Sequence, residues 1–166
     1  MPEVIFDCCV LSNFALADAL PVLKASAGGT VRLTGFVSAE ILRAIQGGHS
    51  RLAAITRGLS EGWIQEAHPS APAEKKLFAS LSQSLGLGEA SSLAVAKARR
   101  WVFACDDRAA RREATLLEVP LTGTIGILVK SVRNKSLKAD QAERVLKRMI
   151  DEGFYSPVRS LKSLPD

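Results

Sequence analysis

Short apolar segments alternate with longer amphipathic segments along the chain. Most of the short segments are runs of apolar residues without polar alternation, and residues 31–34 are short and β-branched. This pattern predicts buried strands at residues 4–6, 31–34, 63–64, 101–105 and 119–121. Between them apolar residues recur at helical spacing, which predicts helices at residues 10–20, 37–45 with a cap at Ser38, 51–59, 73–85, 89–100, 108–117, 124–132 and 139–150. The last of these helices has the clearest apolar stripe.

This order of elements predicts the fold class. Continuous apolar strands separated by helices are typical of a parallel sheet that is covered on both faces, so we expect a three-layer α/β/α arrangement. A chain of 166 residues is an ordinary size for one domain, and no repeat or internal linker divides residues 1–166. In such a sheet ligands bind beyond the carboxyl ends of the strands, so the residues that follow the strands are the candidates for function.

Acidic residues follow the predicted strands. Asp7 comes directly after the first strand, Asp106 and Asp107 follow the fourth, and Glu40 lies in the first turn of the helix after the second strand. Because the carboxyl ends of parallel strands share one edge of the sheet, we expect these side chains to converge. Glu89 begins a helix that leads into the fourth strand, and on this argument alone it is placed at the opposite edge.

A cluster of carboxylates is costly, because each negative charge raises the free energy of ionising the next one, and a bound cation would offset that cost. Oxygen ligands without His or Cys suit Mg²⁺ or Mn²⁺ better than zinc. Such ions orient a phosphodiester, lower the pKa of a bound water and neutralise charge on the leaving oxygen. Taken singly, each acid is also explained as a helix cap or a solvated surface group, so both interpretations stay open at this point.

Composition and charge narrow the classes of protein. The chain has 22 Lys and Arg against 17 Asp and Glu, and the resulting net charge of +5 is scattered and permits an anionic partner. No apolar run approaches the ~18 residues of a membrane-spanning helix, and the N-terminus does not have the pattern of a signal peptide. We therefore expect a cytoplasmic protein that does not act at a membrane. The three cysteines fit neither a disulfide framework nor a zinc site and are expected to be buried, reduced thiols.

Five segments resemble the motifs of PIN-domain ribonucleases, a family that includes the VapC-like toxins of bacterial and archaeal toxin–antitoxin pairs. Residues 4–14, 38–41, 87–90 and 106–111 are similar to the family's four acidic motifs, and residues 121–128 resemble a segment of one poorly characterised PIN subgroup. Each motif alone is a weak signal. Four acids in the family's order, together with the last segment, make the resemblance specific.

The resemblance implies a Rossmann-like parallel sheet and a ribonuclease that hydrolyses RNA phosphodiester bonds with a metal-activated water. It implies that Asp7 is the central ligand of one or two Mg²⁺ or Mn²⁺ ions, and that Glu40 and Glu89 complete the cage or hold its waters. An aspartate of the fourth motif also contributes: the motif's spacing favours Asp107, and the doublet leaves room for Asp106 as well. Only the resemblance brings Glu89 to this site.

Basic and amide residues near the acids are candidates for RNA binding. Arg108, Arg111 and Arg112 are spaced to share a helix face just beyond the aspartates, where they would contact phosphate or pair with nearby acids. Arg111 matches the motif of the subgroup. Asn13, in the first motif, is expected to orient a metal ligand or to contact an RNA phosphate.

The resemblance also implies partners for this protein. They are an RNA substrate, a cognate antitoxin protein and a second copy of the chain in a homodimer. Two alternatives stay open: a processing nuclease that is not a toxin, and a PIN-like module that binds RNA or protein without cutting. Cys8 and Cys9 stand where many members carry Thr or Ser, whose hydroxyl can bond a neighbouring carboxylate. The support around Asp7 is therefore expected to differ from that of the family.

Overall fold

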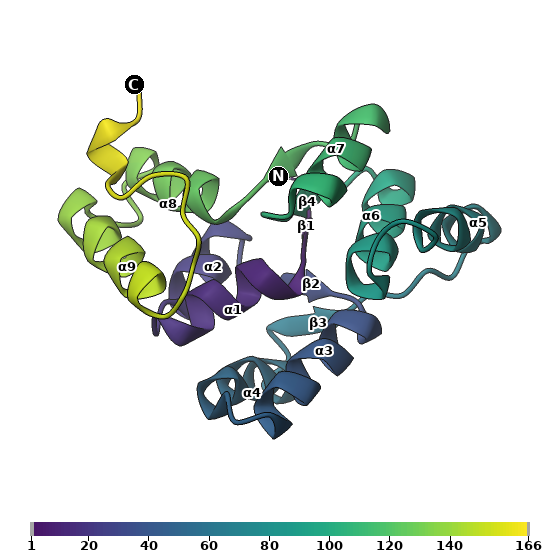
Figure 1. The fold of residues 1–166 in the computed structure, drawn as a ribbon, viewed down its shortest axis with the longest axis horizontal. Helices are drawn as coiled ribbons and strands as arrows, with labels where there is room; N and C mark the ends of the chain where they lie inside the picture. The colour runs from purple at the N-terminus through teal and green to yellow at the C-terminus, as the bar shows by residue number, and fades with distance from the viewer. Residues whose placement is uncertain (1, 166) are drawn as a thin grey trace.

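The computed structural model describes residues 2–165 (Figure 1). Within this range the strands are β1 (Val4–Phe6), β2 (Val31–Leu33), β3 (Ile64–Glu66), β4 (Val102–Ala104) and β5 (Leu121–Thr122). The α-helices are α1 (Cys8–Leu16), α2 (Leu20–Ser26), α3 (Gly35–Gln46), α4 (Ala53–Ser60), α5 (Pro72–Leu81), α6 (Leu87–Arg99), α7 (Arg108–Leu116), α8 (Thr124–Arg133) and α9 (Ala139–Asp151). Two short 3₁₀ turns are η1 (Ser50–Leu52) and η2 (Leu161–Ser163).

All the strands pair in parallel, in the order β3-β2-β1-β4-β5, so the predicted parallel sheet and three-layer α/β class are confirmed. β1 lies in the centre, where Ile5 is in register with Arg32 of β2 on one side and with Phe103 of β4 on the other. The chain adds β2 and β3 on one side of β1 and then crosses to add β4 and β5 on the other. Doubly wound sheets bind ligands where the winding reverses, here between the ends of β1 and β4.

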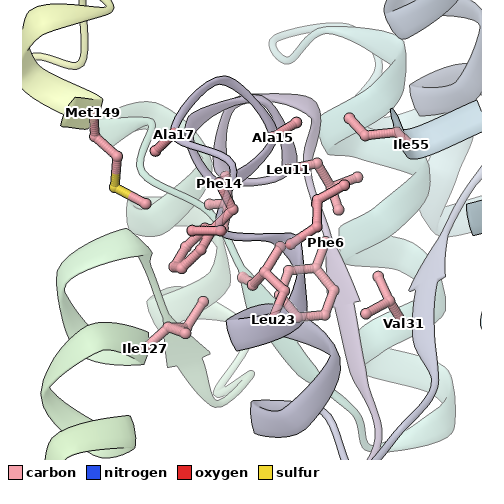
Figure 2. Packing of buried hydrophobic residues seen from close by; sticks show 14 of the residues in the cluster. Phe6, Leu11, Phe14, Ala15, Ala17, Leu23, Val31, Ile55, Ile127 and Met149 are labelled. Atoms are coloured by element: carbon pink, nitrogen blue, oxygen red, sulfur yellow. The ribbon is translucent and has the colours of Figure 1, made fainter. Parts of the chain in front are cut away.

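One apolar core lies between the sheet and the helices α1, α2, α8 and α9. Figure 2 shows Phe6 of β1 packed beside Phe14 of α1 and Leu23 of α2, with Ile127 of α8 and Met149 of α9 closing the same cluster. All five side chains are almost completely buried. Burying an aromatic or aliphatic side chain of this size stabilises a fold by roughly 1.5–3 kcal/mol, so this core anchors the start of α1 next to β1.

A second core covers the other face of the sheet. Ile5 and Phe103 point away from the first core, because neighbouring residues of a strand face opposite sides, and pack with Leu93 of α6 and Ala110 of α7. α5 lies alongside α6 on the outside of this layer (Figure 1). The starts of α1, α6 and α7 are thereby held against the central strands from both faces.

The helix predicted over residues 10–20 is in fact two helices. α1 ends at Leu16, and a turn through Asp18, whose φ is +54°, redirects the chain into α2. α2 has only seven residues and buries Leu20 and Leu23. Two buried positions over so short a segment do not show a helical period, so the pattern could not separate it from a loop.

The helix after β2 begins earlier than predicted. α3 starts at Gly35, and its N-cap is Thr34, whose Oγ1 accepts a hydrogen bond from the backbone N–H of Val37 at 3.4 Å. The predicted cap, Ser38, instead donates its hydroxyl to Glu66 at the end of β3, at 2.7 Å. The earlier start places Glu40 in the second turn of α3 rather than in the first.

Candidate metal centre

Asp7 lies between the end of β1 and the start of α1, and only 2% of its surface is exposed. It occupies the N-cap position, yet its side chain makes no capping bond. Oδ2 accepts a weak hydrogen bond from Cys105 Sγ at 3.9 Å, whereas Oδ1 has no hydrogen-bond partner in the described part of the chain. A buried carboxylate oxygen without a partner is costly, and such an atom commonly marks the place of an ion or water. Helix capping therefore does not explain Asp7.

Three other carboxylates face Asp7. Burial, with smaller contributions from the negative charges of Glu89, Glu40 and Asp107, raises the pKa of Asp7 to about 7. The four acids come from four different elements, and the charges of the other three act on Asp7. A divalent cation among them would offset both the burial and the repulsion.

Glu89 lies in the first turn of α6, close to Asp7. One oxygen of each and the Sγ of Cys105 all lie within 4.8 Å of one another. The placement of Glu89 at the opposite edge is therefore wrong. A helix that leads directly into a parallel strand runs antiparallel to it, so α6 begins at the carboxyl edge of the sheet and ends where β4 starts. Burial, followed by the charge of Asp107, raises the pKa of Glu89 above its usual range.

Glu40 approaches the same place from α3 because α6 carries a glycine where the two helices meet. A Cβ at Gly88 would lie 2.8 Å from Oε1 of Glu40 and 3.0 Å from its Oε2, closer than real Cβ contacts allow. Gly88 is buried, so the carboxylate rests directly on the backbone of α6 beside Glu89. This contact explains the Leu87–Ala90 motif. Gly88 leaves room for the carboxylate of Glu40, and the next residue, Glu89, contributes a second carboxylate.

The two aspartates after β4 have different surroundings. Asp107 is the N-cap of α7, and its Oδ1 accepts the backbone N–H of Ala110 at 2.9 Å. This bond uses one of its two oxygens, and its charge raises the pKa of both Asp7 and Glu89. Asp106, by contrast, has both carboxylate oxygens in hydrogen bonds within the protein. Among the described residues, the hydrogen bonds therefore distinguish Asp107, which has one carboxylate oxygen free of them, from Asp106, which has none.

Asp106 connects the end of β4 to α1 and α8. Its Oδ1 accepts the backbone N–H of Thr124 at 3.0 Å, and its Oδ2 accepts the hydroxyl of Thr124 at 2.6 Å and the amide of Asn13 at 3.3 Å. Asn13 also donates to the Thr124 hydroxyl at 3.1 Å. A Cβ at Gly123 would lie 2.6 Å from Oδ1, so this glycine is needed for the approach. Asn13 thus orients Asp106 and the start of α8.

The three arginines of α7 are not equivalent. Arg111 is half-buried and donates from one guanidinium nitrogen to two backbone carbonyls, those of Cys105 at 2.7 Å and Thr122 at 3.0 Å. It therefore fixes the ends of β4 and β5, and its partners in the structure are backbone carbonyls, neither of the two kinds, phosphate or nearby acids, that the sequence left open. Arg108 and Arg112 are exposed on the same helix, next to Asp107.

The cysteines differ in burial, and the expectation of three buried thiols is wrong for one of them. Cys9 is exposed, Cys8 is half-buried with its sulfur 3.8 Å from the hydroxyl of Ser12, and Cys105 is buried. Burial, followed by the charge of Asp7, raises the pKa of Cys105 above its usual range. The thiol is therefore protonated and donates a hydrogen bond to Oδ2 of Asp7. The sequence analysis did not name Cys105 as a site residue. The available signal is its position directly after β4, two residues beyond Phe103 and therefore on the same face of the sheet.

An all-parallel sheet with acids at its carboxyl edge, where the winding reverses, defines an α/β domain with a candidate metal centre. Residues 3–164 match the family of PIN domains designated DUF3368, and the chain belongs to that family. No curated protein and no solved structure matches the chain. PIN domains are generally metal-dependent nucleases, and the Asp7, Glu89 and Cys105 cluster is able to hold an ion. None of the described helices is long and apolar enough to cross a membrane.

Proposed function

We propose that this protein is an endoribonuclease that depends on Mg²⁺ or Mn²⁺ and hydrolyses RNA phosphodiester bonds, with residues 1–166 acting as one domain. The observation that carries the proposal is Oδ1 of Asp7, a buried carboxylate oxygen that has no hydrogen-bond partner among the described residues, in a side chain on which the charges of three further acids act. The residues that would hold the ion are Asp7, Glu40, Glu89 and Asp107. Carboxylate oxygens are the ligands that Mg²⁺ and Mn²⁺ prefer.

A divalent ion bound there supplies an acidified water and neutralises charge on the reacting phosphate. Asp7, which is the most deeply buried of the four acids, would be the central ligand. Glu40, which lies against Gly88, and Asp107, at the start of α7, would complete the ligand set. Glu89 is half-buried with a raised pKa, so it is suited to accept a proton from the attacking water.

The basic side chains beside the acids support a polyanionic substrate. Arg108 and Arg112 are exposed next to Asp107, where they can bind backbone phosphates, whereas Arg111 is held by carbonyls of the protein. The net charge of +5 acts in the same direction. Asp106 and Asn13 are assigned the task of holding α1 and α8 in place around the site rather than binding the ion.

The direct test is incubation of the purified protein with varied RNAs in Mg²⁺, in Mn²⁺ and in EDTA. The Asp7→Asn variant is expected to lose cleavage by about 100-fold or more, because it loses a charged ligand without changing shape. Asp151→Asn, which removes an exposed acid at the end of α9, is the matched control and should cleave normally. Metal-dependent cleavage that survives in Asp7→Asn contradicts the proposed mechanism. Cleavage by neither protein indicates a PIN-like module that binds RNA or protein without cutting.

We further propose that the nuclease is the toxin of a type II toxin–antitoxin pair in the cytoplasm, with a cognate antitoxin protein and a second copy of the chain as partners. The resemblance of the five motifs to the VapC-like toxins supports this assignment. Induced expression should stop growth in cells that carry the wild-type chain and not in those that carry Asp7→Asn. Growth that continues while RNA is cleaved in vitro would indicate a processing nuclease instead.

A further inference from the structure

Cys105 takes no part in the proposed hydrolysis, although it lies at the centre of the acidic cluster. It follows β4 directly, its exposed fraction is 0%, and its Sγ lies 3.9 Å from Oδ2 of Asp7. The sulfur and one oxygen each of Asp7 and Glu89 are within 4.8 Å of one another. Three potential ligands of two chemical kinds therefore surround one small volume.

The distances in this cluster suit an ion that binds sulfur. Zinc lies about 2.3 Å from a cysteine sulfur and about 2.0–2.2 Å from a carboxylate oxygen, so the two ligand atoms are at most about 4.5 Å apart, and roughly 3.6 Å apart in a tetrahedral site. The observed 3.9 Å between Cys105 Sγ and Asp7 Oδ2 falls inside this range. One ion can therefore bridge the two side chains without a rearrangement of β4 or α1.

Two further observations support a ligand at this point. Oδ1 of Asp7 is buried and has no hydrogen-bond partner in the described part of the chain. The main chain of Cys105 is also held at both ends of the residue, since its N–H donates to the carbonyl of Thr122 at 3.1 Å and its own carbonyl accepts from Arg111 at 2.7 Å. The backbone of Cys105 is therefore held in place, and from it the sulfur lies 3.9 Å from Oδ2 of Asp7.

We propose that Asp7, Glu89 and Cys105 form a thiophilic cation site that binds Zn²⁺ or Cd²⁺ through two carboxylates and one thiolate. Coordination replaces the S–H bond of Cys105 with a sulfur–metal bond and releases the proton to solvent, with no change of oxidation state. Soft and borderline ions accept thiolate ligands, whereas Mg²⁺ does not. Because the site shares Asp7 and Glu89 with the proposed nuclease centre, Zn²⁺ acts there as an inhibitor; this consequence, unlike the binding itself, rests on the proposed function.

The test is a titration of the purified full-length protein, reduced and free of metal, with Cd²⁺, followed by the ultraviolet charge-transfer band of cadmium thiolate. One equivalent per chain is expected to produce the band. Cys105→Ser should abolish it, while Cys8→Ser and Cys9→Ser, the same change at neighbouring thiols, should keep it. Asp7→Asn should weaken the apparent affinity by at least the ~10-fold that loss of an outer-shell partner of a metal costs.

Three results would overturn the proposal: a band that persists in Cys105→Ser, a band that disappears only in Cys9→Ser, or the absence of any band in correctly folded wild-type protein. Circular dichroism checks folding, and Cys105→Ala provides a second, apolar variant for the buried position. Added Zn²⁺ should inhibit cleavage in Mg²⁺ at concentrations about tenfold lower for the wild type than for Cys105→Ser. A cadmium band without RNA cleavage leaves the cation site standing and removes the nuclease function; cleavage without the band does the reverse.

Discussion

The two ends of α6 hold two buried carboxylates with opposite environments. At its first turn Glu89 lies beside Asp7, which is 2% exposed, has an oxygen without a hydrogen-bond partner within residues 2–165, and has a pKa raised to about 7. At its last turn, roughly 15 Å away by helix rise, Arg99 binds Glu74 of α5, which is 3% exposed and has a pKa lowered to about 2. Burial alone thus does not set the state of a carboxylate in this molecule; its partners do.

The Glu74 site shows what a fully satisfied buried acid requires. Its carboxylate accepts the Arg99 Nε at 2.7 Å and the backbone N–H groups of Ser70 and Ala71 at 2.7 and 3.1 Å. Arg99 also donates to the carbonyl of His68 at 2.8 Å, which ties the segment before α5 to the end of α6. Among the described residues, Asp7 has no comparable set of donors. The protein itself thus completes the Glu74 site, whereas the Asp7 site leaves a carboxylate oxygen open for the ligand proposed above.

The largest expected effect comes from breaking the satisfied site. Glu74→Gln should lower the free energy of unfolding by about 2–4 kcal/mol, because it leaves Arg99, which is 31% exposed, without its charged partner. Urea denaturation measures the change. Asp140→Asn removes an exposed ion pair with Arg144 and is the matched control, for which little change is expected. If Glu74→Gln and Asp140→Asn lowered the free energy of unfolding equally, burial would not distinguish the Glu74–Arg99 pair from the Asp140–Arg144 pair.

The second prediction uses pH to separate the two carboxylates. The pKa of Asp7 is raised in the folded state, so between about pH 4 and pH 7 the native protein binds more protons than the unfolded chain, and its stability should fall as pH rises. The pKa of Glu74 is lowered from 4.5 to about 2, so its contribution is present above about pH 4.5 and is lost toward pH 2.

In EDTA at pH 8, Asp7→Asn should therefore be more stable than the wild type by about 1–3 kcal/mol, and the fall in stability between pH 4 and pH 7 should be reduced. Mn²⁺ should stabilise the wild type and leave the variant unchanged, because only the wild type has the charged ligand. Urea midpoints measured across the pH range provide the comparison. A destabilised Asp7→Asn protein in EDTA would mean that the carboxylate supports the fold rather than a ligand.

Part of this contrast could be predicted from the sequence. The apolar strands indicated the parallel sheet, and acids directly after strands or in early helix turns identified Asp7, Glu40 and the Asp106/Asp107 doublet. Those predictions rest on local order along the chain. The division of labour in the doublet depends on Thr124 and Asn13, which are 18 and 93 residues away from Asp106, and no local pattern contains such contacts.

The remaining features depend on three-dimensional proximity in the same way. In the sequence Cys105 is the last residue of an apolar run, like its neighbours in the predicted strand. Its proximity to Asp7 is visible only in the folded structure. The buried partnership of Glu74 with Arg99 joins residues 25 positions apart on two helices that each look solvated on their polar side. The order of strands and helices alone points Glu89 to the opposite edge, and only the resemblance brings it to Asp7; the antiparallel direction of α6 relative to β4 is what places it there.

The third prediction concerns the glycine that admits Glu40. A Cβ at Gly88 would lie 2.8 Å from the Glu40 carboxylate, so Gly88→Ala should push Glu40 away and lower the affinity for Mn²⁺ by about 10–100-fold. Gly86→Ala is the control, because its Cβ would make an ordinary contact of 3.7 Å with Glu89. Calorimetric titration with Mn²⁺ measures both. Equal affinities in the two variants would remove Glu40 from the metal cage.

The smallest expected effect distinguishes two arginines on one helix. Arg108→Gln should weaken RNA binding a few-fold and reduce the slope of log affinity against log salt by about 1, since it removes one phosphate contact. Arg148→Gln, on the exposed side of α9, is the matched control and should not change the slope. Arg111→Gln should instead lower stability, because Arg111 donates to the carbonyls of Cys105 and Thr122. Arg111→Gln could instead change only the salt slope and leave the melting temperature unchanged. That result would contradict the assignment of Arg108 to RNA binding and of Arg111 to support of the fold.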